Sequence, residues 1–205
     1  TVVRMAGHYR TLLAALAADP GRLIDSVDLR TESERAEIEG WNRTAKAFGP
    51  SAAHPAHVLI HQQAKRTPDA VALRFRGLAL TYRELDLRSN RLAHRLRRLG
   101  AGPDYPVAIC MERSLELVVA ILGVLKAGGA YVPLDPDYPA QRIAYMVSDA
   151  APQVILCQDS LVDRLPEHAA QVVCLNAEDA NDALLPDSLP EVAVDPSNLA
   201  YVIYT

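Results

Sequence analysis

Several residue types are scarce in this sequence, and each shortage argues against a class of protein. Aromatic residues make up only 5% of the 205 residues, which argues against a surface that stacks nucleic-acid bases. The longest apolar run, roughly residues 115–125, contains Glu116 and is far shorter than the ~20 residues of a membrane span. The first residues lack the basic region and cleavage site of a secretory signal peptide. We therefore expect neither nucleic acid nor a membrane as a partner.

Cysteine is also rare, and charge of one sign does not dominate. Cys110, Cys157 and Cys174 each stand alone in an apolar, strand-like run, which is typical of reduced core thiols and not of a disulfide framework or a metal site. The net charge of −4 gives no field that would attract the chain to nucleic acid or to an anionic bilayer. Half of the residues are hydrophobic, enough to bury a substantial core. We expect a cytoplasmic globular protein.

The glycine-rich motifs of common nucleotide-binding folds are missing. No G-x-G-x-x-G follows a strand-like run, and no G-x-x-x-x-G-K-[ST] occurs. Gly123 and the pair Gly128-Gly129 belong to a predicted helix and its end, so we assign them to helix packing and termination rather than to phosphate binding. A dinucleotide-dependent dehydrogenase and a P-loop NTPase are both unsupported by motif.

The first part of the sequence predicts two helices and a linker. Apolar residues recur at helical spacing over residues 2–18, and an Asp-Pro-Gly sequence ends the pattern. A short extended stretch, residues 23–29, leads to Thr31, which with Glu34 has the spacing of a capping box. Residues 42–57 show no periodicity and predict a linker.

From residue 57 onward, helices and short strands alternate. The helix at 81–99 begins with a second capping-box pattern, Thr81 with Glu84, and Leu80 and Leu85 are placed to form a hydrophobic staple. The other helices are predicted at 57–66, 114–126 and 139–149, with Pro139 in the first turn of the last; the strands are predicted at 71–75, 78–80, 107–110, 130–134, 154–157, 172–175 and 200–204.

This alternation, with nearly continuous apolar strands, predicts an α/β fold in which helices cover a mostly parallel sheet. The helix from Ser114 is apolar on almost every side, so we expect it to lie deep in the domain. The pattern ends on an apolar strand with nothing after it, and we expect the chain to be a fragment.

Three groups of polar residues are candidates for chemistry, and each has a simpler explanation. His57 and His61 stand four apart on a helix, a spacing that can share a metal, but a third ligand is not evident and an assignment as surface or packing histidines is favoured. Asp135 and Asp137 flank Pro136 in a loop after a strand, where turn formation and helix capping are favoured over metal binding. The arginines of the 81–99 helix are interpreted as a solvated helix face, because acidic residues balance the total charge; they are Arg83, Arg88, Arg91, Arg95, Arg97 and Arg98.

Five stretches together resemble the adenylation domains of non-ribosomal peptide synthetases. The most specific is Leu125–Asp135, LKAGGAYVPLD, which resembles the second core motif of that family. LTYREL, residues 80–85, resembles the first core motif, and NLAYVIYT, residues 198–205, resembles the lead-in to the third. TPDAVA at 67–72 and MERSLE at 111–116 are similar to phrases typical of the family.

The residues upstream are similar to the end of a condensation domain and its linker. The matching stretches are HYRTLL at 8–13, LRTESER at 29–35 and Trp41-Asn42. The resemblance implies three parts: the end of a condensation domain at 1–30, an inter-domain linker at 31–56, and the N-terminal part of a truncated adenylation domain at 57–205. For the fold, the resemblance implies that the chain forms the partial N-terminal subdomain of an adenylate-forming enzyme, preceded by the helical tail of another domain.

The resemblance also implies a function for the parent enzyme. Such a domain uses ATP and Mg²⁺ to convert an amino acid to an aminoacyl-adenylate, and passes it to the phosphopantetheine thiol of a carrier domain for peptide secondary-metabolite synthesis. Condensation and carrier domains would be partners in the same polypeptide.

The side chains that perform this chemistry in the family fall after residue 205, so no catalytic residue and no metal ligand is assigned here, and the isolated chain is expected to be inactive. Only Thr205 matches the ATP phosphate loop, as its first residue, where its hydroxyl and N–H would be in reach of phosphate; it is otherwise simply a strand end.

Two other interpretations stay open. A stand-alone acyl- or aryl-CoA ligase of the same superfamily would lack the condensation-like residues 1–42. A scaffold module that docks condensation and adenylation domains is suggested by the apolar stripe of residues 2–18. Within the adenylation part, we assign Leu125–Asp135 a structural role beside the site rather than contact with ligand.

Overall fold

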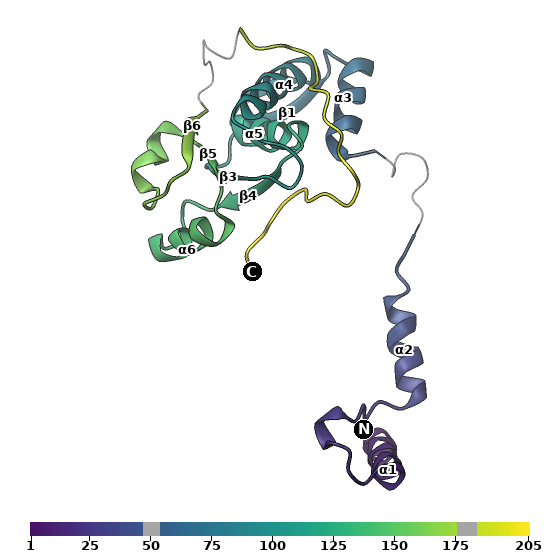
Figure 1. Ribbon diagram of the computed structural model, residues 1–205. Helices are drawn as coiled ribbons and strands as arrows, with labels where there is room; N and C mark the ends of the chain where they lie inside the picture. The colour runs from purple at the N-terminus through teal and green to yellow at the C-terminus, as the bar shows by residue number, and fades with distance from the viewer. Residues whose placement is uncertain (47–53, 176–183) are drawn as a thin grey trace. The chain divides into compact units, whose positions relative to one another are not determined.

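The computed structural model describes residues 1–46, 54–175 and 184–205, and the chain divides into two compact units, Thr1–Phe48 and Gly49–Thr205. The first unit contains helix α1 (Val2–Ala18), a single 3-10 turn η1 (Ile24–Ser26) and helix α2 (Glu32–Asn42) (Figure 1). The helix predicted at 2–18 is therefore confirmed. The stretch 23–29 was predicted to be extended. This prediction is only partly correct, because η1 lies within the stretch.

The two helices of this unit are joined by polar contacts. Thr31 and Glu34 form the predicted capping box, and the Glu34 carboxylate also lies 2.8 Å from Nε2 of His8 on α1. Hydrogen bonds from Thr31 and from His8 favour the ionised carboxylate and lower the pKa of Glu34 to about 2. In contrast, α1 has no buried residue.

The second unit is built on a four-stranded parallel sheet with the order β4-β3-β5-β6. Its elements in chain order are α3 (Ala56–Arg66), β1 (Val71–Phe75), β2 (Leu78–Thr81), α4 (Tyr82–Arg98), β3 (Pro106–Cys110), α5 (Leu115–Lys126), β4 (Ala130–Leu134), α6 (Ala140–Ala150), β5 (Val154–Cys157), η3 (Asp159–Arg164) and β6 (Gln171–Cys174). The expected α/β class is confirmed. The 3-10 helix η3 was not predicted.

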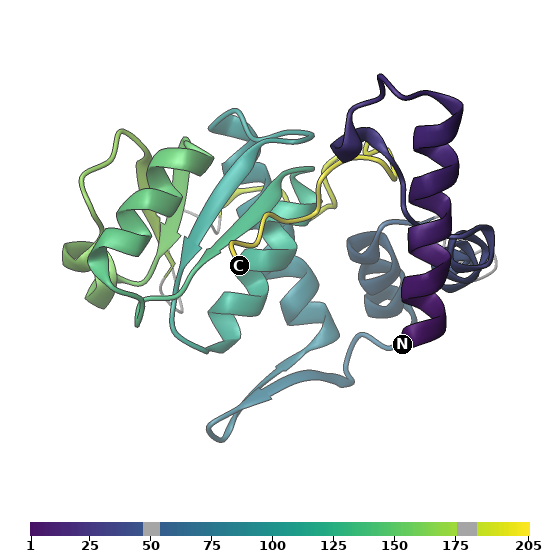
Figure 2. The same ribbon diagram turned by 90° about the horizontal axis from the view of Figure 1, so that it is seen from below.

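Strands β1 and β2 form a separate antiparallel hairpin that projects from the body of the unit (Figure 2). The turn between them consists of Arg76 and Gly77, whose φ angles are 46° and 84°. Two consecutive positive φ values define the turn type that matches the twist of a tight hairpin, and glycine adopts it readily. The hairpin leads directly into α4, whose predicted capping box of Thr81 and Glu84 is present.

The strands of the parallel sheet present alternate residues to two apolar cores. Ile109 and Leu156 belong to the core on the α4 and α5 side, whereas Ala108 and Ile155 belong to the core on the α6 side. This is the period of two expected of strands buried on both faces, and Figure 1 shows α5 and α6 on opposite sides of the strands. Helix α5 lies deep, as its sequence predicts.

The strand predicted at 200–204 is reduced to a single parallel bridge between Tyr201 and Tyr131 of β4. The segment lies at the edge of the sheet rather than in its interior, and Tyr201 and Ile203 are 53% and 56% exposed. The prediction of a full strand at 200–204 was therefore wrong, and this apolar run has only one strand neighbour in the described part of the chain. Pro139 also differs from its prediction, since it is the N-cap of α6 and not part of its first turn.

The three cysteines occupy matching positions on neighbouring strands. Cys110, Cys157 and Cys174 are register partners across β3, β5 and β6, all three are free thiols, and the first two are buried. The expected core location is thus confirmed for Cys110 and Cys157, while Cys174 is half-buried. Within the residues that the structure describes, no helix is long and apolar enough to cross a bilayer.

One charged side chain lies in the interior of this unit. The ammonium of Lys126, at the end of α5, is 2.6 Å from the Asp86 carboxylate and also donates to Ser89 Oγ and Asn90 Oδ1, at 2.8 and 2.7 Å. The side chain of Lys126 is fully buried. Burial lowers the pKa of Lys126, and the hydrogen bond with Asp86 opposes that effect.

The network extends beyond these two helices. Nδ1 of His61 on α3 lies 2.9 Å from the other Asp86 oxygen, and the amide of Asn90 donates to the carbonyl of Asp187, at 2.6 Å. Three helices and the segment after residue 184 therefore meet at one buried ion pair.

We predict that Lys126→Met destabilises the chain by roughly 3–5 kcal/mol, because removing one partner of a buried ion pair leaves the largely desolvated Asp86 carboxylate without its lysine counter-ion. Urea unfolding followed by circular dichroism measures the change. Lys65→Met is the matched control, since Lys65 is an exposed lysine at the end of α3 and should change the stability by less than about 0.5 kcal/mol. A Lys126→Met variant as stable as the Lys65→Met control would contradict the assignment.

Candidate functional site

Ligands of parallel α/β sheets bind where the carboxyl ends of the strands open. Here the chain leaves β3 at Cys110 and β4 at Leu134, and the loops after these two strands line a cavity of about 670 Å³ together with Ile203 and Tyr204. The cavity is thus formed by three segments distant in sequence. It lies at the edge where a ligand is expected.

The loop after β4 forms a turn that is stabilised by hydrogen bonds to Asp135. Oδ1 of Asp135 accepts a hydrogen bond from the backbone N–H of Asp137, at 2.9 Å, and the carbonyl of Asp135 accepts one from the N–H of Tyr138, at 3.1 Å. The predicted turn at Asp135 is therefore confirmed. The predicted helix cap is not, because α6 has no side-chain cap hydrogen bond.

The polar groups around this cavity carry both signs of charge. Glu112 and Arg113 follow β3 and are exposed, and the N–H of Glu112 donates to Gln158 Oε1, at 2.9 Å. Beyond the loop after β4, the guanidinium of Arg142 lies 4.3 Å from the ring centroid of Tyr138. Because charges of both signs lie around the cavity, its electrostatic field does not select a ligand of one charge.

The last residues of the chain reach this edge alongside β4. The N–H of Tyr131 donates to the carbonyl of Ala200, at 3.1 Å, and the N–H of Val202 donates to the carbonyl of Tyr131, at 3.0 Å. Tyr204 donates its hydroxyl proton to Asp149 of α6, at 2.7 Å. Burial and this hydrogen bond raise the pKa of Tyr204 to about 12. Thr205 comes next as an exposed residue, so the residue singled out in the sequence lies next to the lining of the cavity.

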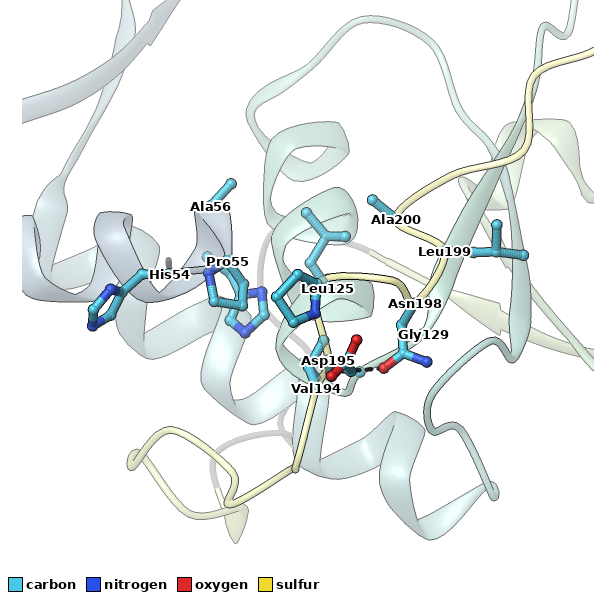
Figure 3. Close-up of a pocket in the computed structure, with 13 residues that line it drawn as sticks. His54, Pro55, Ala56, Leu125, Gly129, Val194, Asp195, Asn198, Leu199 and Ala200 are labelled. Carbon is cyan, nitrogen blue, oxygen red and sulfur yellow. Dashed lines mark hydrogen bonds between the residues drawn. The ribbon is translucent and has the colours of Figure 1, made fainter. Parts of the chain in front are cut away.

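A second, smaller cavity of about 260 Å³ lies at the opposite, amino end of the strands (Figure 3). It lies between the start of α3, the Gly128-Gly129 turn before β4, and the segment 194–200. His57 lines it and is only 8% exposed. Burial, together with the charge of Lys126, lowers the pKa of His57 to about 4, so its ring is neutral at pH 7. The position at the amino ends argues against this cavity as the nucleotide site.

The two histidines considered as a metal pair are in different surroundings. His61 is paired with Asp86, whereas His57 lines the amino-end cavity. Across residues 1–46, 54–175 and 184–205, no three side chains of His, Cys, Asp or Glu are grouped to hold a metal ion.

The arginines of α4 have surface roles. Arg97 and Arg98 are exposed and Arg88 is half-buried, while Arg83 and Arg91 pair with Asp69 and Asp187. Arg95 is half-buried.

Sequence reasoning missed the polar groups that hold the terminal residues. The apolar pattern places Tyr204 only in a strand, and the helical pattern places its partner Asp149 only at the end of a helix. Asp104 stands in no motif, although its carboxylate accepts hydrogen bonds from Asn198 and from the N–H of Leu199. Each pair is separated by 55 to 95 residues, so a local pattern gives no signal for it.

Comparison with known proteins identifies the family. The model of the AMP-binding enzyme family matches residues 60–205. A component of the linear gramicidin synthase of Brevibacillus parabrevis is 45% identical over 210 residues, and chondramide synthase cmdD of Chondromyces crocatus is 46% identical over 213 residues. Both alignments cover 100% of this chain, which spans only 3% and 5% of the two proteins.

Solved structures give the same result. A crystal structure of the non-ribosomal peptide synthetase FmoA3 superimposes with a TM-score of 0.73 at 32% identity, covering 100% of this chain and 22% of that one. Two similar structures hold α-methyl-L-serine-AMP and AMPPNP, respectively. The likeness to peptide synthetases indicated by the core motifs is confirmed, and the chain belongs to the AMP-binding enzyme family.

Proposed function

We propose that this chain is the N-terminal part of an amino-acid adenylation domain within a non-ribosomal peptide synthetase. Residues 57–205 form that part, residues 31–56 form an inter-domain linker, and residues 1–30 are the end of a preceding condensation domain. The parent enzyme activates an amino acid with ATP for the synthesis of a peptide secondary metabolite.

The observation that carries this proposal is the extent of the similarity. The family model begins at residue 60, but the gramicidin and chondramide synthases align over the whole chain, including the residues before it. A stand-alone acyl-CoA ligase accounts for residues 60–205 alone. The upstream match therefore favours a multidomain synthetase.

The surface of α1 supports the assignment of residues 1–30 to another domain. Val2, Val3, Met5 and Tyr9 are between 63% and 85% exposed. An apolar helix face of this kind normally packs against further structure of the same domain or of a partner. A helix cut from the end of a condensation domain would leave such a face.

The proposed reaction transfers an adenylyl group. A carboxylate oxygen of the amino acid attacks the α-phosphorus of ATP, a new P–O bond forms, and the bond to the β-phosphate breaks with release of pyrophosphate. The acyl group of the adenylate then moves to the phosphopantetheine thiol of a carrier domain, and AMP leaves. Such steps depend on positioning and on stabilising the charge that develops on phosphate oxygens.

The contribution of this chain to the reaction is at the carboxyl edge of the sheet. Thr205 would donate its hydroxyl and N–H to a phosphate oxygen. Mg²⁺ would be held mainly by the nucleotide phosphates, as is usual for this ion.

We predict that the 205-residue chain catalyses no ATP–pyrophosphate exchange with any of the twenty amino acids, whereas the intact parent module does so with one or a few of them. The chain covers only 22% of FmoA3, so most residues of that synthetase have no counterpart in it. ATP–pyrophosphate exchange by the 205-residue chain would contradict its assignment as an incomplete adenylation domain. Lack of exchange by a folded parent module with every amino acid would contradict amino-acid adenylation.

In the parent module, we predict that Thr205→Val raises the KM for ATP by on the order of tenfold, because one hydrogen bond to a charged acceptor is lost. Thr205→Ser, which keeps the hydroxyl, is the matched control and should stay within about twofold of the wild type. Initial rates of exchange at varied ATP concentration measure both variants. An unchanged KM in Thr205→Val would show that this side chain does not contact phosphate.

A further inference from the structure

The segment 184–205, here called the terminal segment, crosses the second unit and ends at the carboxyl edge of the sheet (Figure 1). Its beginning is held by α4. Arg91 donates to the carboxylate of Asp187, at 2.7 Å, and the carbonyl of Ser188 lies 2.9 Å from Nε2 of His94. The start of the segment is therefore fixed far from the cavity at the carboxyl edge.

The middle of the terminal segment forms a compact polar turn. Oδ1 of Asp195 accepts hydrogen bonds from the N–H and the hydroxyl of Ser197, at 2.9 and 2.6 Å. Asn198 Oδ1 in turn accepts one from the N–H of Asp195, at 2.8 Å, as Figure 3 shows. The turn leaves the amide NH₂ of Asn198 and the N–H of Leu199 directed toward the rest of the unit.

Both of these donors bind one carboxylate. Oδ2 of Asp104 accepts from Asn198 Nδ2, at 2.9 Å, and Oδ1 of Asp104 accepts from the N–H of Leu199, at 2.7 Å. Asp104 lies in the loop between α4 and β3 and has a φ of 60°, a left-handed conformation uncommon for a residue other than glycine. A loop residue whose carboxylate is occupied by two donors from one segment is a contact that can position that segment.

The two hydrogen bonds of the Asp104 carboxylate with Asn198 and Leu199 are here called the Asp104 clamp. The contacts with β4 begin immediately after it. Ala200 and Val202 bond to the two sides of Tyr131, and Tyr204 bonds to Asp149. From Leu199 the chain continues alongside β4 to Thr205. An extended chain advances about 3.3 Å per residue, so a slip of two residues on β4 would move Thr205 by roughly 7 Å.

We infer that Asp104 is a positioning residue for the ATP site: its carboxylate sets the register in which the terminal segment lies on β4, and thereby the place of Thr205 at the carboxyl edge. The register needs this help because the segment pairs with β4 through one bridge. The inference rests on the proposed function for its effect on ATP, but not for its effect on the segment.

The first test uses the 205-residue chain and needs no activity. Asp104→Gly removes the carboxylate while keeping a residue that adopts φ of 60° without strain. Amide hydrogen exchange measured by NMR should become at least about tenfold faster at Leu199, because its N–H loses a charged acceptor. It should become faster by a similar factor at Val202, because the bond of that N–H to the Tyr131 carbonyl depends on the register of the segment. The amides of Ile109 and Leu156 in the central strands should be unaffected. Unchanged exchange at Val202 would overturn the inference, even with faster exchange at Leu199.

The second test uses the parent module and separates the two substrates. Asp104→Gly should raise the KM for ATP about tenfold and change the KM for the amino acid by less than about twofold. Asp104→Asn, which keeps one oxygen acceptor and tolerates the left-handed conformation, should recover part of the loss. Asp69→Asn is the control, since its carboxylate pairs with Arg83 at the surface and should have no effect.

Equal losses for both substrates, or none, would overturn the positioning role. A wild-type module without exchange activity would instead refute the proposed function, and the hydrogen-exchange result would still decide whether Asp104 holds the terminal segment.

Discussion

The buried ion pair of Lys126 and Asp86 fixes the arrangement on which the rest of the second unit depends. An ammonium that is removed from water loses several kcal/mol of hydration, and it regains this energy only if all its donors find partners. Here three side-chain acceptors lie within 2.8 Å of the nitrogen, all on α4. A shift of α5 along α4 would break these contacts together. The pair thus selects one packing of the two helices, whereas apolar contacts alone tolerate small slides.

The fixed end of α5 also sets the course of the turn and the strand after it. Lys126 is the last residue of the helix, and the chain then turns through Gly128, whose φ of 88° is readily adopted only by glycine. A β-carbon at Gly128 would lie 2.8 Å from Val192 of the terminal segment, so the turn and this segment are closely packed. Strand β4 begins two residues later, and its Tyr131 bonds the end of the chain. The motif at 125–135 therefore acts on the carboxyl edge through the backbone.

Much of this fold can be predicted from local patterns. The capping boxes at Thr31 and Thr81 are correctly predicted because all their hydrogen bonds lie within four residues. The strands of the parallel sheet are recognised because they are buried on both faces and so are continuously apolar. The same rule predicts a strand at 200–204 and is wrong there, since an apolar run does not reveal whether one or two strands lie beside it. Tyr201 and Ile203 point away from the core that Val202 and Tyr204 contact.

The contacts that support the candidate site are harder to predict because they join distant segments. Lys126 meets Asp86 across 40 residues, and Asp104 meets Leu199 across 95. Neither carboxylate stands in a motif, although their partners Lys126 and Leu199 belong to the motifs at 125–135 and 198–205. The core motifs identify a framework, and in the function proposed here that framework sets where Thr205 lies rather than contacting a ligand. If the chain contributes in this way, substitutions at Asp104 and Lys126 have different consequences. Loss of the Lys126 pair weakens the whole unit, whereas loss of the Asp104 clamp releases one segment and leaves the sheet intact.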